Sequence, residues 1–185
     1  MIFMTIRRYV SVTSLVVMLL LSIGGAQGVD LRDESSPASV GQKATADEVE
    51  QTRQAPVNSK ALLDAYLEKP VKDNPLTYLS EAARRRFVAS LTFNENGLTG
   101  FRYDDLEAEL TVTQAYEVLR LFGAQSKLTA LDLAASSRQD AELFDVLEKS
   151  PPSLAQDYKE YKCIGRATCR LAEFHICMRG CASIP

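Results

Sequence analysis

The chain contains a single histidine, His175, and has no cysteine in its first 162 residues. A Ser-His-Asp triad would therefore have to use His175. The sequence also lacks the G-x-S-x-G, G-x-x-x-x-G-K-[ST] and dinucleotide-binding glycine motifs, and it has no C-x-x-C spacing. These absences remove the commonest signatures of hydrolases, nucleotide-binding proteins and redox enzymes. They favour a protein without catalytic activity and without a cofactor.

Residues 1–28 have the three parts of a secretory signal peptide. Arg7 and Arg8 precede an apolar run from Val10 to Ile23, and the small residues that follow suit cleavage after Gly28. A membrane anchor is the alternative, but a spanning helix needs about 20 apolar residues. We therefore expect a secreted protein, extracellular or periplasmic if bacterial, with no membrane attachment after cleavage.

Cleavage would make the protein more acidic. Loss of Arg7 and Arg8 changes the formal net charge from −3 to −5. Such a chain has no general attraction for nucleic acid or anionic membranes. The expected partner is an unidentified extracellular or host protein.

The chain changes character at about residue 58. Residues 29–57 are rich in small and polar residues and contain no aromatic side chain. Such a segment cannot bury enough apolar surface to offset the entropy lost on folding. We predict a disordered linker over 29–57 and a helix-rich globular domain over 58–150.

Several helix ends can be read inside this domain. Thr111 and Gln114 have the spacing of a capping box, and Gly123 is placed to end the helix that follows. Ser59 and Asp140 are expected to cap two further helices.

A β-hairpin is predicted near residues 88–104, around the Asn96-Gly97 turn. One possible register of the two strands has a two-residue Asn-Gly loop. We favour a three-residue loop over 95–97, which places Phe93 opposite Thr99 and gathers the aromatic residues on one face.

Residues 151–185 are predicted to form a cysteine-containing helical tail. Apolar residues recur at helical spacing over 167–179, at Ala167, Leu171, Phe174 and Met178. The predicted fold is therefore mainly α with one β-hairpin, a small α+β domain followed by a disulfide-stapled helical tail.

The four cysteines are Cys163, Cys169, Cys177 and Cys181, and in an exported chain we expect two disulfides. On one straight helix Cys169 and Cys177 would be about 12 Å apart, beyond the roughly 7 Å that a disulfide can bridge. This favours the local pairs 163–169 and 177–181. If the helix breaks between residues 170 and 174, the nested pairs 163–181 and 169–177 become possible.

A zinc site is the rival interpretation of the cysteines, because His175 lies among them. Structural zinc sites usually contain closely spaced cysteine pairs, and only Cys177-x3-Cys181 approaches that spacing. Export also favours oxidation of the thiols. We therefore predict disulfides and no metal.

We interpret the chain as a secreted, non-enzymatic protein that binds another macromolecule, as an inhibitor, an immunity-type protein or an effector-like protein. The candidate partner-binding residues are Asn96 at the hairpin tip and Asp104 and Asp105 just after the hairpin. The order of signal, unstructured spacer and helical domain is similar to that of secreted effectors of plant pathogens such as oomycetes. The R-x-L-R translocation motif of that group is absent.

Two alternatives stay open. A secreted hydrolase would use the acidic residues after the hairpin, because paired carboxylates are the machinery of glycosidic hydrolysis. A precursor of a C-terminal cysteine-rich peptide is the other, although no dibasic cleavage site precedes Cys163.

Overall fold

The computed structural model describes residues 47–68, 73–149 and 157–181. All of them belong to Asp33–Pro185, one of the two units into which the chain divides. The predicted signal peptide over 1–28 and the first part of the predicted linker, 29–46, lie outside the described residues.

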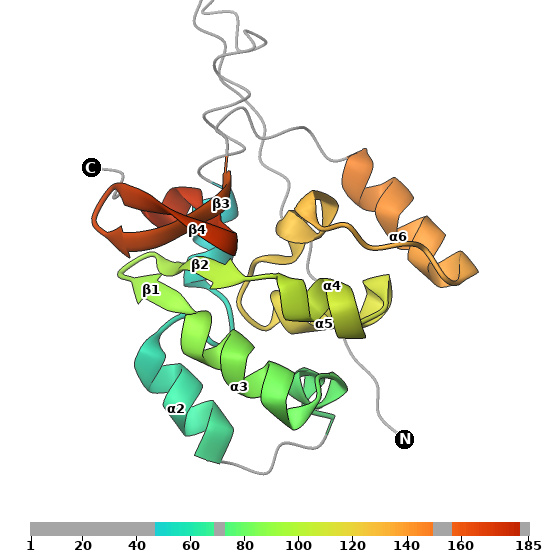
Figure 1. Ribbon diagram of the computed structural model, residues 1–185, viewed down its shortest axis with the longest axis horizontal. Coiled ribbons are helices and arrows are strands. Elements are labelled where there is room, and N and C mark those ends of the chain that lie inside the picture. Colours follow the sequence, from blue (N-terminus) through green and yellow to red (C-terminus); the bar gives the residue numbers. More distant parts are fainter. Residues whose placement is uncertain (1–46, 69–72, 150–156, 182–185) are drawn as a thin grey trace, which may run out of the picture. The chain divides into compact units, whose positions relative to one another are not determined.

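The described residues contain a four-stranded antiparallel sheet in the order β1-β2-β4-β3 (Figure 1). Its strands are β1 (Thr92–Asn94), β2 (Gly97–Arg102), β3 (Tyr158–Gly165) and β4 (Thr168–Cys177). β4 pairs with β2, with Ile176 opposite Phe101. The small α+β class is therefore confirmed. The cysteine-containing segment completes the sheet of the domain, where we had predicted a separate tail.

Short helices make up the rest of the described fold. The α-helices are α2 (Lys60–Glu68), α3 (Glu81–Ser90), α4 (Asp104–Glu109), α5 (Val112–Arg120) and α6 (Arg138–Glu148). The 3-10 helices are η1 (Pro75–Tyr78), η2 (Gln125–Ala130) and η3 (Arg179–Cys181). Residues 47–53 are also helical.

The helix ends follow the local sequence closely. The predicted capping box of α5 is confirmed, because Thr111 accepts from the backbone N–H of Gln114 while the Gln114 side chain accepts from that of Thr111. Ser59 accepts from the N–H of Leu62 at the start of α2. Asp140 does not cap α6. Ser137 does, and Asp140 is buried in the first turn.

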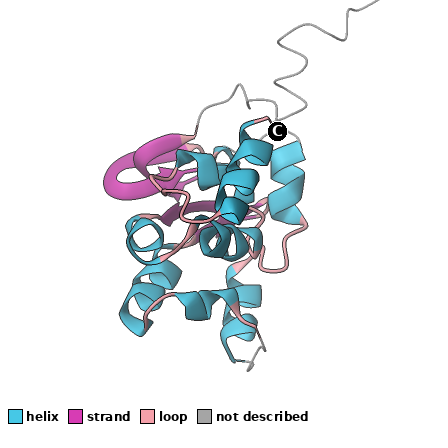
Figure 2. Ribbon diagram, turned by 90° about the vertical axis from the view of Figure 1, so that its right-hand side faces the viewer, coloured by secondary structure: helices cyan, strands magenta, loops and turns pink. Residues whose placement is uncertain are grey.

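The main core lies where helices α3 and α5 meet the sheet. Three buried aromatic rings pack edge to face at the centre of the core. The centroid of the Phe87 ring lies 6.2 Å from that of Phe101 and 6.0 Å from that of Phe122. Ile176 from β4 and Met178 beyond it belong to the same cluster. Figure 2 shows the helices grouped together and the long strand pair β3–β4 curling away from them. The C-terminal segment therefore contributes directly to the core.

Residues 47–57 differ from the disordered linker that we predicted over 29–57. Val49, Thr52, Ala55 and Val57 are buried. The segment runs over Gly97 and Gly123, where an added Cβ would lie 2.5 Å from the carbonyl oxygen of Thr52 and 2.4 Å from that of Gln51. Its own apolar content is small, but a core built by other elements receives it.

The first hairpin is confirmed, and its predicted register is wrong. Phe93 lies opposite Leu98, and two residues, Glu95 and Asn96, connect the strands. The Asn94 side chain accepts from the N–H of Asn96, and this Asx turn tightens the loop. A bulge next to Phe93 restores the alignment of the strands, so the aromatic residues still reach the core.

The predicted helix over 167–179 is wrong, because these residues form β4 and its continuation. The apolar stripe does not face a core: Leu171 and Phe174 are exposed, while Met178 is buried. Arg166 and Ala167 form the turn of a second hairpin, between the paired residues Gly165 and Thr168.

Candidate interaction surface

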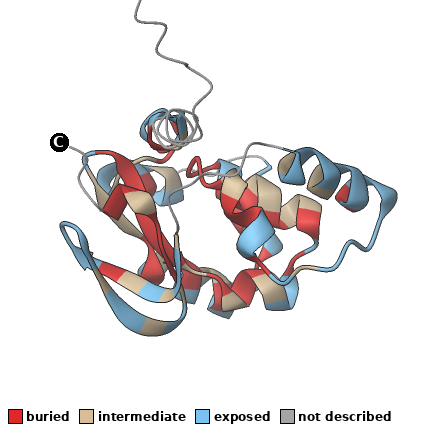
Figure 3. Ribbon diagram, turned by 90° about the horizontal axis from the view of Figure 1, so that it is seen from above, coloured by how far each residue is buried: buried red, intermediate tan, exposed pale blue. Residues whose placement is uncertain are grey.

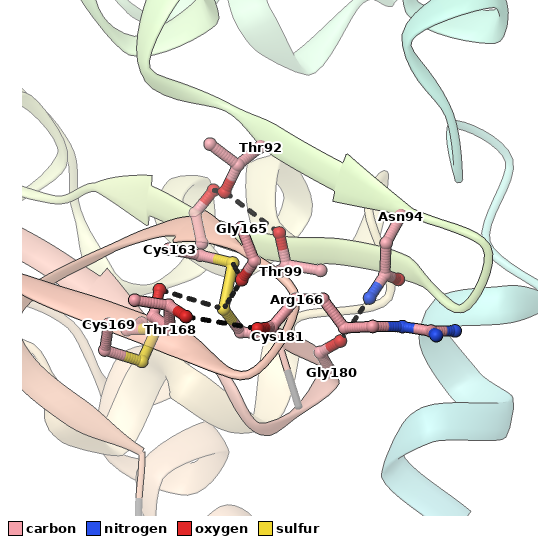
Figure 4. The surroundings of a disulfide bond; sticks show 12 residues. Thr92, Asn94, Thr99, Cys163, Gly165, Arg166, Thr168, Cys169, Gly180 and Cys181 are labelled. Carbon is pink, nitrogen blue, oxygen red and sulfur yellow. Dashed lines mark hydrogen bonds between the residues drawn. A yellow bond between two sulfur atoms is a disulfide. The ribbon is translucent and has the colours of Figure 1, made fainter. Parts of the chain in front are cut away.

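The disulfides are nested, Cys163–Cys181 and Cys169–Cys177. The local pairing that we favoured is therefore wrong, and the nested alternative is correct. Figure 4 shows Cys163 and Cys181 joined beside Gly165 and Thr168. The first bridge ties the outer part of β3 to η3, and the second ties the two ends of β4 to each other.

The second bridge requires β4 to bend sharply. The Cα atoms of Cys169 and Cys177 lie 6.0 Å apart, whereas eight residues of straight strand would span about 26 Å. The bend lies at Phe174 and Glu160, which have φ of 61° and 67°. The register also shifts there, between Lys159 and Tyr161, and leaves extra residues on β4. This large irregular bulge folds the hairpin back so that Cys169 and Cys177 meet.

Glu160 holds this bend together. Its carboxylate accepts from the hydroxyl of Tyr103, and it accepts from the backbone N–H of Phe174 at 2.8 Å. The Tyr103 hydrogen bond is the main cause of a lowered Glu160 pKa. Burial, followed by the same hydrogen bond, raises the pKa of Tyr103. A neutral phenol donating to a carboxylate is therefore the stable arrangement around neutral pH.

The hairpin presents an unusual concentration of exposed apolar side chains. Nine large apolar residues are exposed among the described residues, and five of these belong to β3 and β4: Tyr158, Tyr161, Ile164, Leu171 and Phe174. Their exposed fractions run from 36% to 69%. Figure 3 shows much of the curled strand pair as exposed or intermediate. Contiguous exposed apolar groups mark interaction sites in soluble proteins.

Three of these side chains form what we call the aromatic face: Tyr158, Tyr161 and Leu171. The two tyrosine rings pack edge to face with centroids 5.9 Å apart. Tyr161 lies directly opposite Leu171 across the hairpin. Tyrosines offer rigid, amphipathic contact area at low entropic cost, which is why they are enriched in binding surfaces.

A cavity of about 440 Å³ lies between the two hairpins. Its lining includes Thr92, Thr99 and the Cys163–Cys181 bridge. The hydroxyls of Thr92 and Thr99 are hydrogen-bonded to each other, and two further lining residues, Arg166 and Glu95, form an ion pair at 3.2 Å. Glu95 is the only carboxylate among the lining residues. The cavity thus contains no carboxylate pair for glycosidic chemistry.

The sulfur atoms form one cluster. Those of Cys163, Cys177 and Cys181 all lie within 4.8 Å of one another. Each is committed to a disulfide, so none is a thiolate ligand in this structure. His175 lies elsewhere, with Nδ1 2.7 Å from the carbonyl oxygen of Glu173.

The candidate binding residues at the first hairpin have contacts within the chain. Asn96 is buried, and its backbone and side-chain oxygens accept hydrogen bonds from Thr52 and Arg53, the latter at 2.8 Å. Asp105 is buried and pairs with Arg86 of α3. Asp104 pairs with Arg102, and this hydrogen bond is the main cause of its lowered pKa. The three residues hold the fold together and do not form one open surface.

The acidic residues that follow have similar contacts. Glu109 accepts from the N–H and the hydroxyl of Ser80, at the N-terminus of α3. Glu107 accepts from the N–H of Asp132 at 2.8 Å and lies 3.8 Å from the ammonium of Lys159. These contacts join neighbouring elements. They give no support to the alternative of a hydrolase built on this acidic stretch.

Sequence reasoning missed the aromatic face because it placed these residues in a helical tail. The available signal was the run of β-formers on each side of Gly165, Tyr-Lys-Glu-Tyr-Lys-Cys-Ile before it and Thr-Cys-Arg-Leu after Arg166-Ala167.

Comparison with protein-family models, with curated proteins and with solved structures finds no match to this chain. Within the described residues, no helix combines the length and the apolar character needed to cross a bilayer.

Proposed function

We propose that this chain is an exported, non-enzymatic protein that binds another macromolecule through the aromatic face of the β3–β4 hairpin. The observation that carries the proposal is the exposure of Tyr158, Tyr161 and Leu171 on a hairpin that two disulfides and Glu160 hold in one conformation. Solvent-exposed apolar groups contribute little to the stability of the fold. Holding them in one conformation reduces conformational entropy, and a partner that covers them would explain why they are held there.

Preorganisation supports this assignment. A loop that is already ordered loses less conformational entropy on binding than a flexible one. The bend at Phe174 would be costly in an unrestrained strand, because a non-glycine residue seldom adopts a positive φ. The two bridges and the Glu160 contacts fix this conformation before a partner arrives. Disulfides also suit an exported protein, which meets oxidising conditions.

The test is site-specific photocrosslinking with the oxidised full-length protein. A photoreactive amino acid replaces Leu171, and in a matched control it replaces Leu62, a leucine of α2 that is also exposed. We expect a partner to crosslink at position 171 only. The purified partner should then bind the parent protein and Leu62→Ser equally, and Leu171→Ser at least tenfold more weakly, about 1.4 kcal/mol. Equal crosslinking at both positions, or undiminished binding of Leu171→Ser, would contradict the proposal.

A further inference from the structure

Lys162 and Arg170 lie directly opposite each other in the β3–β4 ladder. Like charges at directly opposed positions destabilise an antiparallel pair. Neither side chain has a hydrogen bond or an ion pair with any described residue. The hairpin therefore brings two cations to opposed positions, and neither forms an ion pair with a described residue.

This arrangement stands out against the other cations of the hairpin. The ammonium of Lys159 donates to the carbonyl of Ala130 and lies 4.7 Å from the centroid of the Tyr103 ring. Arg166 pairs with Glu95. Lys162 and Arg170 alone among the described cations of β3, β4 and their turn have no such contact. We call these two residues the cationic pair.

The cationic pair and the aromatic face occupy opposite sides of the same strands. Successive residues of a strand point to opposite faces, and Tyr161 and Leu171 are the immediate neighbours of Lys162 and Arg170. Ile164, two residues after Lys162, adds an exposed apolar side chain near the pair. A partner that encloses the hairpin would therefore meet apolar groups on one side and positive charge on the other.

We propose that the partner is a protein with an acidic surface, and that its carboxylates supply the counter-ions of Lys162 and Arg170. The full chain has 24 acidic and 21 basic residues, so a local excess of positive charge opposes the overall balance. Complementary charge of this kind steers encounter and fixes orientation. The flanking Ile164 and the aromatic face on the reverse side favour a polypeptide, which offers apolar side chains beside its carboxylates. This inference rests on the proposed function and specifies the chemistry of the partner.

The test uses an acidic polypeptide of defined chemistry, because the natural partner is not identified. A fluorescent random copolymer of glutamate and tyrosine is titrated with the oxidised full-length protein at low salt, and binding is followed by anisotropy. We compare Lys162→Ser/Arg170→Ser with Arg138→Ser/Lys149→Ser. The control pair removes the same charge at the two ends of α6, from Arg138 at its start and from Lys149 just after its last residue, and both cations are exposed.

We expect Lys162→Ser/Arg170→Ser to weaken binding about tenfold, from two partly exposed ion pairs, and the α6 variant to weaken it less than twofold. Equal weakening by both variants would mean that only net charge matters and would overturn the inference. So would binding of heparin or phosphatidylserine vesicles as tight as that of the copolymer, with the same dependence on Lys162 and Arg170. Absence of copolymer binding by the parent protein would overturn it as well.

The two proposals fail separately. If Leu171→Ser loses the crosslinked partner while Lys162→Ser/Arg170→Ser retains it, the hairpin binds a partner that does not need the cationic pair. If neither variant loses the partner, the proposed function fails too.

Discussion

Removing the outer disulfide should destabilise the entire described domain. The change is Cys163→Ala/Cys181→Ala, which opens a bridge between residues 18 positions apart. Loop-closure entropy assigns about 3 kcal/mol to a loop of this length. The inner bridge spans eight positions, and the same relation gives about 2.6 kcal/mol for Cys169→Ala/Cys177→Ala. Loss of both would approach 5–6 kcal/mol, comparable with the total stability of a small domain.

The loss should be global because the C-terminal segment is built into the core. The backbone N–H of Met178 donates to Thr99 at 2.8 Å, and that of Tyr103 donates to Phe174 at 2.8 Å. Ile176 and Met178 pack with the helices that surround Phe87. A loss of stability caused by opening the disulfide is therefore shared by elements far away in the sequence, such as α5.

Urea denaturation followed by circular dichroism measures the effect. With a slope of about 1.5 kcal/mol/M for a domain of this size, the outer variant should shift the midpoint by about 2 M. Amide hydrogen exchange should show α5 losing protection together with β4. Full retention of α5 protection in the reduced protein would refute the argument, because it would mean that the cysteine-containing segment opens independently.

Three further changes test separate features of the structure. Gly123→Ala should lower the free energy of unfolding by about 2 kcal/mol or more, because Gly123 has a φ of 70° and an added Cβ would meet the backbone of residues 51 and 52. In the control Gly165→Ala no atom lies near the added Cβ, so the change should be close to neutral. Equal melting temperatures for the two variants would contradict the close approach at Gly123. Asp140→Ala should cost about 3 kcal/mol, because the buried carboxylate accepts from backbone and hydroxyl groups of Thr113 and Ser136. The hydrogen bond from the Thr113 hydroxyl is the main cause of the lowered Asp140 pKa. The stabilisation by this carboxylate is therefore present above about pH 4 and is lost as the pH falls below it. An acid-unfolding profile that is unchanged in Asp140→Asn would exclude Asp140 as the source of this pH dependence. Glu160→Gln should loosen the bend, seen as faster exchange of the Phe174 amide, and should leave α5 unchanged; unaltered exchange at Phe174 would contradict the role of the carboxylate.

Local signals predicted the helical half of the fold well. The capping box at Thr111 and Gln114 and the left-handed Gly123 depend on chemistry within a few residues, so they can be read from the sequence alone. The first hairpin was recognisable from Asn96-Gly97 for the same reason. Its register was not, because Asn94 and Thr52 fix the loop through contacts that lie outside the repeating apolar pattern.

The C-terminal half could not be derived in the same way. The spacing of Ala167, Leu171, Phe174 and Met178 satisfies a helical period by coincidence, and short apolar patterns do not separate helix from strand. What decides the structure is pairing with β2, a contact across about 75 residues of chain that no local pattern encodes. The prediction of disulfide pairs failed with the helix on which it depended. The bend at Phe174 lies at the limit of the 170–174 window in which a helix break would have allowed the nested pairs.

The same long-range pairing explains why the sequence directed attention to the first hairpin and not to β3 and β4. Acidic residues after β2 attracted attention because charge is visible in a sequence, yet Asp105 is buried against Arg86. The aromatic face becomes visible only when Tyr161 and Leu171 are placed opposite each other across the β3–β4 hairpin. An edge strand that carries exposed tyrosines is an aggregation hazard unless charge or a partner protects it. In β3 the lysines at 159 and 162 provide such charge, but Lys159 has contacts within the fold, whereas Lys162 faces Arg170 without a counter-ion. Protection of the edge alone would not require a second cation directly opposite Lys162, and this excess of positive charge is the reason to expect an acidic partner.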